Sequence, residues 1–330
     1  MEDDGQMKIC FVDHIFEHPK DIVVEDCRID IHGPVKDPAL LVELAQDADI
    51  LCTRDQFMKY DRSVIDQLPK LRLIVTRSTG YNHIDWKHAA SKGIPVCNVP
   101  GYGSNTVAEF AAGLMLSVSR KIPKAARRYS QNDYSIDGME GVDLEGKTLG
   151  IVGTGSIGLK MARIAKGLGM HVCAYDMIED KMAAERIGFA YVTFEELLQK
   201  SDVVSLHLPL NEKTHHIINA QTLSQMKPGA ILINTGRGEL VDTEALIVAL
   251  KERRLFGVGL DVIEGERERV YDFDDLNAVV STHIGWFTHE AVRRIVTIAL
   301  NNIRAFLKGV PTNVVNQDCL EQKGANDETP

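Results

Sequence analysis

Short apolar runs alternate with amphipathic stretches along most of the chain, which is the pattern of a protein built from parallel strands with helices between them. In the first part of the chain, strands are predicted at 7–12, 21–25, 48–52, 71–76 and 94–99, and helices at 40–46 and 63–68. These elements predict a first parallel sheet with its own hydrophobic core.

The pattern changes after the last of these strands. Pro100–Gly103 interrupts the alternation, and Ser104 or Asn105 can cap a long helix that is predicted to run to about Tyr129. Further strands are predicted at 149–152, 171–175, 203–206, 230–233, 258–262 and 279–281, with a helix at 243–253. A last amphipathic helix, 288–308, is long enough to return to the first sheet. We therefore expect an α/β protein in which a second, doubly wound domain is inserted into a domain built from both ends of the chain.

The segment 147–176, KTLGIVGTGSIGLKMARIAKGLGMHVCAYD, places the sequence G-x-G-x-x-G between a predicted strand and a predicted helix. Gly153 permits the tight turn, Gly155 lets a pyrophosphate approach the backbone, and Gly158 lets the helix pack closely on the strand. The first N–H groups of the helix, at the positive end of its dipole, would face the phosphates. In this context the motif predicts a dinucleotide-binding (Rossmann) domain, whereas the glycines alone would also suit an ordinary turn.

The second strand of this unit ends at Asp176, roughly 20 residues after Gly158, which is the usual spacing for an acid that binds the ribose hydroxyls. Its carboxylate would repel a 2′-phosphate, and no arginine follows immediately. The sequence therefore predicts NAD as the cofactor, in preference to NADP. An enzyme that uses flavin or S-adenosylmethionine on a similar sheet is an alternative that Asp176 disfavours.

Composition restricts the class of protein. Of the 330 residues, 44% are hydrophobic, which suits about two globular domains. The net charge of −10 disfavours a nucleic-acid partner. The six cysteines are scattered, as expected in a reducing compartment. The chain starts with MEDDGQ and has no run of roughly 18 apolar residues, so we expect no signal peptide, no membrane span and a cytoplasmic location.

Two pairs of histidines raise the question of a metal site. They are His14 with His18, and His215 with His216. Neither pair has a third ligand at a useful spacing in the sequence, so no metal site is predicted.

Seven segments in a fixed order resemble those of the D-isomer-specific 2-hydroxyacid dehydrogenases, a family that includes D-lactate and D-3-phosphoglycerate dehydrogenases and glyoxylate and hydroxypyruvate reductases. They are RSTGYNHID (77–85), VPGYGSNTVAEF (99–110), GIVGTGSIG (150–158), LHLPL (206–210), INTGRGELVD (233–242), GLDVIEGE (259–266) and STHIGWFT (281–288). The resemblance implies two Rossmann-like, doubly wound, parallel-sheet domains. A substrate domain would comprise residues 1–101 and 288–330, and an inserted NAD-binding domain residues 102–287.

The resemblance also implies three catalytic residues, Arg237, Glu266 and His283. His283 would donate a proton to the keto oxygen of the substrate and take it back in the reverse direction. Glu266 would stabilise the protonated imidazole, and Arg237 would bind the substrate carboxylate with its planar guanidinium. Taken singly, these residues also suit a core histidine, a solvated charged loop and a surface cation. Their shared position, just beyond predicted strands, favours catalysis.

Further contacts follow from the same resemblance. The substrate carboxylate would meet the backbone N–H groups of Ser78, Thr79 and Gly80, and Tyr102 would face the substrate, although a packing role suits Tyr102 equally well. The expected cofactor contacts besides the glycines and Asp176 are Ser156 and Ile157 at the pyrophosphate, Leu208, Pro209 and Thr214 near the adenine, and Val107, Thr235, Gly236, Arg237 and Asp261 around the nicotinamide.

The chain departs from the family pattern at several places. Gly236 stands where alanine is usual, and Ser281-Thr282-His283 lacks the usual proline before the histidine. Cys52-Thr53-Arg54 lacks the aromatic residue that is common in lactate enzymes, whereas Tyr102 favours a lactate-like substrate.

We therefore expect an enzyme for a small D-2-hydroxy acid and its 2-keto acid, with D-lactate slightly favoured. Glyoxylate or hydroxypyruvate, D-3-phosphoglycerate, and a non-catalytic NAD-sensing binder similar to transcriptional corepressors are the alternatives. The resemblance also implies a homodimer formed through the helix predicted at 104–129.

Overall fold

The structure is a computed structural model that describes residues 6–13, 22–54, 58–265, 271, 273 and 275–321. The chain divides into two compact units. The first unit consists of Met1–Tyr102 and Thr288–Pro330, and the second unit is Gly103–Phe287. Within the described residues no helix is both long and apolar enough to cross a membrane.

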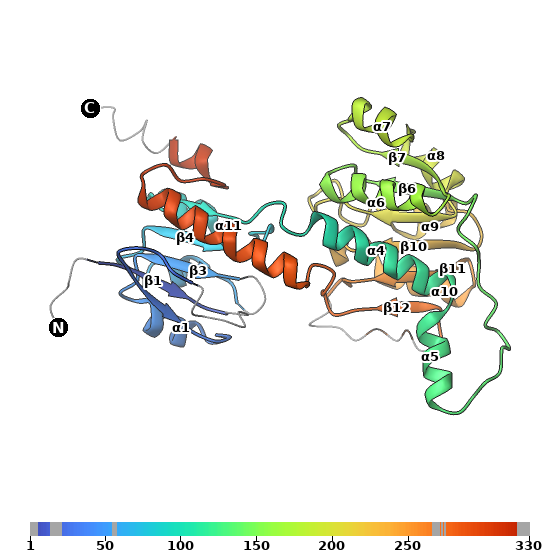
Figure 1. Ribbon diagram of the computed structural model, residues 1–330, viewed down its shortest axis with the longest axis horizontal. Helices are drawn as coiled ribbons and strands as arrows, with labels where there is room; N and C mark the ends of the chain where they lie inside the picture. Colours follow the sequence, from blue (N-terminus) through green and yellow to red (C-terminus); the bar gives the residue numbers. More distant parts are fainter. Residues whose placement is uncertain are drawn as a thin grey trace. The chain divides into compact units, whose positions relative to one another are not determined.

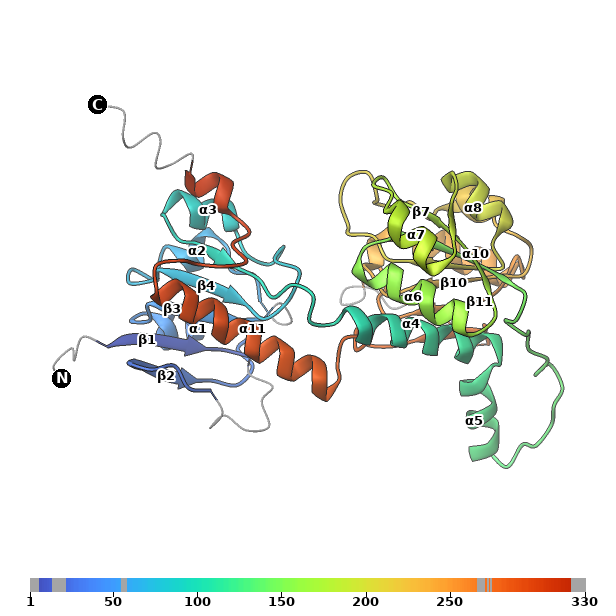
Figure 2. The same ribbon diagram turned by 45° about the horizontal axis from the view of Figure 1, so that its top comes forward.

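The first unit contains a five-stranded parallel sheet in the order β2-β1-β3-β4-β5. Its strands are β1 (Met7–Phe11), β2 (Cys27–Ile31), β3 (Ile50–Thr53), β4 (Leu73–Thr76) and β5 (Val96–Cys97). Its helices are α1 (Pro38–Ala45), α2 (Arg62–Ile65), α3 (Trp86–Ser91) and α11 (His289–Leu307). Figures 1 and 2 show α11, drawn in red-orange, beside strands from the other end of the chain.

Buried asparagines tie the C-terminal segment into the first unit. Asn316 accepts a hydrogen bond from the N–H of Val96 at 2.9 Å and donates to the carbonyl oxygen of Ile94 at 3.0 Å. Asn302 of α11 donates to the carbonyl oxygen of Asn98 at 2.8 Å. These bonds satisfy buried polar groups that are more than 200 residues apart in sequence, so both chain ends build one core.

The strand predicted at 21–25 is wrong for residues 22–25, which form no strand. Ile22 and Val24 are buried as the apolar pattern suggests, but in an irregular segment. The strand next to β1 is β2, whose CRIDI sequence alternates apolar and charged residues because it is a half-exposed edge strand.

The second unit contains a seven-stranded parallel sheet in the order β12-β11-β10-β9-β6-β7-β8. The strands are β6 (Thr148–Val152), β7 (His171–Tyr175), β8 (Ala190–Tyr191), β9 (Val203–Leu206), β10 (Ala230–Asn234), β11 (Leu255–Leu260) and β12 (Ala278–Val280). The helices are α4 (Ser104–Ser119), α5 (Ile122–Ser130), α6 (Ser156–Gly167), α7 (Lys181–Ile187), α8 (Phe194–Lys200), α9 (Ala220–Gln225), α10 (Thr243–Lys251) and the short 3₁₀ helix η2 (Gly238–Leu240).

Two hydrophobic cores cover the two faces of this sheet. Because successive side chains of a strand point to opposite faces, Ile231 and Ile233 of β10 pack with α4 and α6, whereas Leu232 packs with α8, α9 and α10. Figure 1 shows α4 and α6 on a common face of the sheet. This two-sided burial explains why these strands are continuous apolar runs in the sequence.

The single helix predicted at 104–129 is wrong, because the structure has two helices there. α4 ends at Ser119, Lys121 adopts a left-handed conformation with φ of 50°, and α5 begins at Ile122. Pro123 lies in the first turn of α5, where its missing N–H costs nothing, whereas inside one continuous helix it would remove a hydrogen bond and clash with the preceding turn.

Helix α4 lies so close to the sheet that β11 needs glycine beneath it. A Cβ atom on Gly259 would lie 2.8 Å from Cβ of Leu114 and 2.9 Å from Cδ1 of Ile233. We predict that Gly259→Ala lowers the stability by about 1–3 kcal/mol through overpacking. Calorimetry should show a melting temperature lower by several degrees.

Gly167→Ala is the matched control, since a Cβ atom at this last position of α6 would meet no atom within 4 Å. It should be neutral or stabilise by up to about 1 kcal/mol. Equal melting temperatures for the two variants would contradict the close packing of α4.

Candidate active site

The carboxyl ends of the strands of the second unit carry most of the predicted site residues. Gly153 follows β6, Leu208 follows β9, Thr235 follows β10, Asp261 follows β11, and His283 lies shortly after β12. Because the strands are all parallel, these positions share one edge of the sheet. The strand order reverses between β6 and β9, and ligands of doubly wound sheets bind at such a reversal.

The loop between β6 and α6 is shaped by its glycines. Gly153 has φ of 98°, and a Cβ atom there would lie 2.7 Å from the carbonyl oxygen of His207. A Cβ atom on Gly158 would lie 2.0 Å from the carbonyl oxygen of Gly153. At Gly155, by contrast, a Cβ atom would meet nothing within 4 Å, and α6 begins at Ser156 without a side-chain cap. This open space beside the N-terminus of a helix fits the pyrophosphate of a dinucleotide.

Asp176, the residue predicted to bind the ribose, is hydrogen-bonded to the glycine loop. Its Oδ2 accepts hydrogen bonds from the N–H of Thr154 at 2.6 Å and from the Thr154 hydroxyl at 3.1 Å, and its Oδ1 accepts from the N–H of Ile178 at 3.0 Å. Partial burial by itself would raise the pKa of Asp176, but these hydrogen bonds outweigh it and hold the pKa below its usual range. The carboxylate is therefore charged at neutral pH.

The sequence did not reveal the part played by Thr154. Its hydroxyl also lies 2.9 Å from the hydroxyl of Tyr191, so the loop, Asp176 and β8 form one polar network. Thr154 occupies a variable position of the G-x-G-x-x-G motif, and its polarity was the only available signal.

The end of β10 is held by Asn234, a fully buried residue that was not predicted. Its side chain accepts a hydrogen bond from the N–H of Gly236 at 3.0 Å and donates to the carbonyl oxygen of Arg237 at 2.8 Å. A polar residue that closes the apolar run AILIN was the signal for it. Next to it, the buried Oγ1 of Thr235 has no hydrogen-bond partner among the described residues. This orphaned hydroxyl fits a residue that contacts the cofactor.

Arg237 leaves the sheet in an extended conformation just before η2. Its Nη1 donates to the carbonyl oxygen of Gly236 at 2.9 Å, and no carboxylate in the described part of the chain forms an ion pair with it. The following residue packs very tightly, since a Cβ atom on Gly238 would lie 2.2 Å from the carbonyl carbon of Ile263. The turn is thus fixed while the half-buried guanidinium keeps donors for an anionic ligand.

His283 lies on a turn that the carboxylate of Asp261 organises. His283 is half-buried and left-handed, with φ of 58°, and its N–H donates to the carbonyl oxygen of Asp261 at 2.9 Å. The Asp261 side chain is 2% exposed and accepts three hydrogen bonds, from the Ser281 hydroxyl at 2.8 Å and the N–H groups of Ile284 at 2.9 Å and Gly285 at 2.8 Å. The contact of Asp261 with the nicotinamide amide stays a prediction.

His207 is a second histidine near these strand ends, but it is unsuited to proton transfer at neutral pH. The residue is half-buried, its Nδ1 is inaccessible, and its Nε2 lies 2.9 Å from the Ser205 hydroxyl. Burial lowers the pKa of His207 to about 4. It therefore stays neutral where an acid would have to be protonated.

In the first unit, the loop after β4 offers free backbone donors. None of the N–H groups of Ser78, Thr79 and Gly80 donates a hydrogen bond to another described residue. The two hydroxyl groups of this loop are used inside the unit, because that of Ser78 donates to the carbonyl oxygen of Gly80 and that of Thr79 donates to the carbonyl oxygen of Val99. The arrangement suits binding of a carboxylate by backbone N–H groups.

The other predicted residues lie on the elements expected for them. Val107 is on α4 and Ile157 on α6, both half-buried, and the hydroxyl of Ser156 lies 2.9 Å from that of Ser104. The Thr214 hydroxyl donates to the carbonyl oxygen of Pro209 at 2.7 Å. It thus closes the loop after Leu208. Direct contact of these side chains with the cofactor stays a prediction.

The structure places two of the three expected catalytic residues. Arg237 follows β10 and His283 follows β12, with β11 between them. Strands lie about 4.8 Å apart, so the two strand ends are separated by about 10 Å, a span that suits a small ligand. Glu266 lies outside the described residues, as do His14 and His18.

Comparisons with known proteins show a family to which the chain is similar. A family model described as D-isomer specific 2-hydroxyacid dehydrogenase, NAD binding domain, matches residues 112–285. The chain is 41% identical to the glyoxylate reductase of Thermococcus litoralis over 86% of this chain and 90% of that protein. It is also 41% identical to the D-lactate dehydrogenase kk1H of Curvularia clavata, over 86% of this chain and 84% of that one.

A solved structure shows the same relationship. The D-lactate dehydrogenase of Aquifex aeolicus, in complex with NAD and lactic acid, superposes with a TM-score of 0.79 at 30% identity. The similarity covers 91% of this chain and 96% of that one.

The hydrogen bonds of Asp261 lead to a prediction about the turn at 281–285. Asp261→Asn replaces one acceptor oxygen by an NH₂ group, which would face the N–H donor of either Ile284 (at Oδ1) or Gly285 (at Oδ2) and leave the other bond in place. We expect faster amide hydrogen exchange at whichever of the two residues loses its acceptor, and a loss of stability of about 1–3 kcal/mol. Ser281→Ala removes only one of the bonds and should have a smaller effect. Unchanged exchange at both Ile284 and Gly285 in the Asp261 variant would show that the turn does not depend on this carboxylate.

Proposed function

Because the chain belongs to the D-isomer-specific 2-hydroxyacid dehydrogenases, which use NAD, we propose that it interconverts a small D-2-hydroxy acid and its 2-keto acid with Arg237, Glu266 and His283 as catalytic residues. The observation that carries the proposal is how the surrounding residues leave Arg237 available for a ligand and hold the turn of His283 in place. The guanidinium has no carboxylate partner among the described residues, and the histidine is held on a turn by a buried carboxylate.

Arg237 and backbone N–H groups are proposed to bind the carboxylate of the substrate. Arg237 binds the substrate carboxylate through two parallel N–H donors and withdraws electron density from the adjacent keto group. The free N–H groups of Ser78, Thr79 and Gly80 are available to the same kind of carboxylate. NAD, when bound, carries the hydride.

His283 manages the proton. During reduction its imidazolium donates a proton to the oxygen of the keto group, and during oxidation the neutral ring accepts it from the hydroxyl. Glu266 stabilises the charged ring. Because Asp261 fixes the turn on both sides of His283, the backbone that carries the ring does not have to be ordered when the substrate arrives.

The substrate is proposed to resemble D-lactate. Tyr102, the residue behind this choice, is held at its backbone, where its carbonyl oxygen accepts a hydrogen bond from Nε of Arg294 at 2.6 Å. Glyoxylate or hydroxypyruvate is the alternative, and the equal identity to a glyoxylate reductase and a D-lactate dehydrogenase supports both. D-3-phosphoglycerate is less favoured.

The proposal predicts NADH oxidation with at least one small 2-keto acid. The measurement is the loss of absorbance at 340 nm with pyruvate, glyoxylate, hydroxypyruvate, 2-ketobutyrate and phenylpyruvate, and the formation of NADH with D-3-phosphoglycerate. Pyruvate should give the highest kcat/KM. A preference for glyoxylate or hydroxypyruvate would replace the lactate assignment, and silence with all of them would contradict the small substrate.

Variants test the residue roles in the same assay. His283→Ala should lower kcat by about 10²–10⁴-fold with NADH binding retained, since general acid catalysis contributes about this much. Arg237→Lys keeps the charge but loses the fork, so KM should rise and kcat fall together. His171→Ala removes an exposed histidine of β7 and should change neither kcat nor KM. Normal turnover by either site variant would remove that residue from the mechanism.

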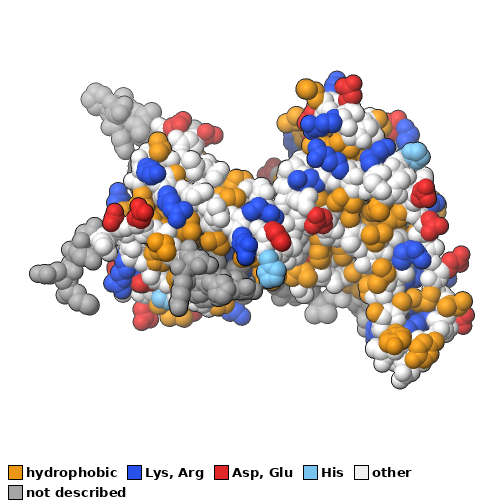
Figure 3. All heavy atoms as spheres, in the orientation of Figure 1, with side chains coloured by type: hydrophobic (Ala, Val, Ile, Leu, Met, Phe, Trp, Pro, Cys, Tyr) orange, Lys and Arg blue, Asp and Glu red, His pale blue; other side chains and the backbone are white. Residues whose placement is uncertain are grey.

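We also propose that the protein forms a homodimer through α4, α5 and the segment after them. α5 has no buried residue, and apolar side chains on it and beyond it are exposed, among them Ile122, Tyr129, Tyr134 and Ile136 at 51%, 70%, 71% and 85%. Figure 3 shows hydrophobic side chains gathered over this part of the second unit. A patch of exposed apolar side chains of this kind supports association of two copies of the chain.

Sedimentation equilibrium tests the dimer. We expect a mass near twice the 36.6 kDa of one chain, and a shift toward the single-chain mass for Ile136→Asp. Ile178→Asp alters an isoleucine that is equally exposed elsewhere in the second unit and should leave the mass unchanged. A single-chain mass for the unmodified protein at micromolar concentration would rule out the dimer.

A further inference from the structure

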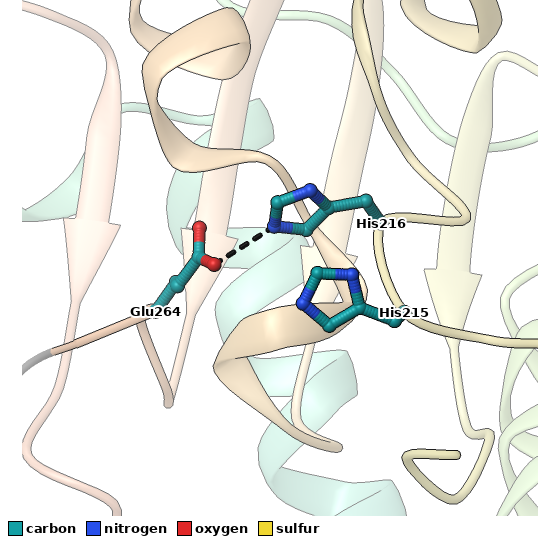
Figure 4. A group of neighbouring side chains, drawn as sticks. All are labelled: His215, His216 and Glu264. Atoms are coloured by element: carbon teal, nitrogen blue, oxygen red, sulfur yellow. Dashed lines mark hydrogen bonds and ion pairs between the residues drawn. The ribbon is translucent and has the colours of Figure 1, made fainter. Parts of the chain in front are cut away.

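We infer that His215, His216 and Glu264 form a binding site for a divalent transition-metal ion such as Zn²⁺. The ligand atoms of these three residues lie within 4.8 Å of one another (Figure 4). Imidazole and carboxylate groups are the ligands that such ions prefer. Glu264 is the third ligand that the sequence did not reveal, because it lies 48 residues from His216.

The backbone explains why two adjacent histidines point the same way. In an extended strand their side chains would point to opposite faces. Here His216 is left-handed, with φ of 49°, and the two rings lie one over the other with centroids 4.0 Å apart. This conformation is fixed, because the N–H of His216 donates to the carbonyl oxygen of Glu239 at 2.8 Å and its own carbonyl oxygen accepts from Asn219 at 2.9 Å.

Glu264 is brought to the histidines by tight backbone packing. The turn at Gly238 approaches Ile263 and Glu264 so closely that a Cβ atom on Gly238 would lie 2.4 Å from the nitrogen of Glu264. The segment that carries His216 is bound to the same turn, since the N–H of Ile218 donates to the carbonyl oxygen of Leu240 at 3.1 Å. Three separate segments are therefore joined around the cluster.

A hydrogen bond alone accounts for only part of the arrangement. Nε2 of His216 lies 2.8 Å from Oε1 of Glu264, which would satisfy these two residues. This bond does not account for His215. Its exposed ring has no hydrogen-bond partner in the described part of the chain, yet it is stacked against the ring of His216. A shared cation gives all three side chains a common role.

The distances are compatible with coordination after small rotations. Zinc binds nitrogen and oxygen at about 2.0–2.2 Å, so the ligand atoms of a tetrahedral site are about 3.4 Å apart. The ligand atoms, which now lie up to 4.8 Å apart, would have to approach one another by about 1.4 Å at most. The distance between Nε2 of His216 and Oε1 of Glu264 would have to increase by about 0.6 Å. Both side chains are partly exposed, at 32% and 24%, and an ion can enter from solvent. Three protein ligands leave a fourth position for water.

Metal binding to metal-free full-length protein tests the site directly, without reference to turnover. Equilibrium dialysis with Zn²⁺ should show a saturable site that is weakened at least tenfold by His215→Asn and by Glu264→Gln, since even residues behind the ligands change metal affinity by about 10–100-fold. His171→Asn alters an exposed histidine on β7 and should bind as the unmodified protein does. Zn²⁺ should also raise the melting temperature of the unmodified protein and not that of the His215 variant.

Co²⁺ distinguishes this site from binding at cysteine. The protein has six free thiols, and a cysteine ligand would give a thiolate-to-cobalt charge-transfer band. We expect Co²⁺ to bind without this band, and the visible spectrum to be lost in Glu264→Gln. A thiolate band, equal affinity in the His215 and Glu264 variants, or no saturable binding of Zn²⁺ would each overturn the assignment. None of these outcomes depends on whether the protein reduces a 2-keto acid.

Discussion

The buried carboxylate of Asp261 joins the end of β11 to the turn after β12, and the position of His283 depends on it. A charge that is 2% exposed is tolerated because three donors surround it, and all three come from the turn that carries the histidine. The same residue fixes that turn a second time through its backbone, where its carbonyl oxygen accepts from the N–H of His283. The proposed acid–base residue, His283, is thus placed by the residue that follows β11 more than by β12, the strand before it.

Close backbone contacts also fix other loops of the second unit. Gly153, Gly158 and Gly238 each lie where a single extra carbon would overlap a main-chain atom, so the loops after β6 and β10 are in contact with their neighbours and cannot relax separately. In β11, a Cβ atom on Gly257 would likewise overlap the carbonyl oxygen of Asn277, whereas one on Gly259 would overlap the side chains of Leu114 on α4 and Ile233. The strand ends that bear the site are therefore positioned by contacts between main chains, which vary less than contacts between flexible side chains.

The sequence predicted the parts of the fold whose burial follows a simple period. β10 and β9 are buried on both faces and appear as apolar runs, and the helix predicted at 288–308 is confirmed as α11. β2 was missed because an edge strand with one exposed face carries charged residues. The break at Lys121 depends on a left-handed residue that is not a glycine, and Pro123 was its only sign.

For the site, the sequence identified residues through motifs but not through their partners. Arg237, His283 and the three glycines stand in recognisable patterns, whereas Asn234 and Thr154 act through hydrogen bonds whose direction depends on the folded chain. Glu264 could not be found in this way, since only the tight turn at Gly238 brings it to His216. Proximity between residues that are far apart in the chain arises from packing and produces no periodic pattern in the sequence.

The bonds between Asp176 and Thr154 bear on how such a protein could change its cofactor during evolution. The carboxylate proposed to select NAD also holds the main chain of the phosphate-binding loop. A mutation that removes the charge to admit a 2′-phosphate would also loosen the loop that must bind the pyrophosphate. A lineage that acquires NADP use would need a second change that restores the loop, so the two substitutions are coupled and the single mutant is an unfavourable intermediate.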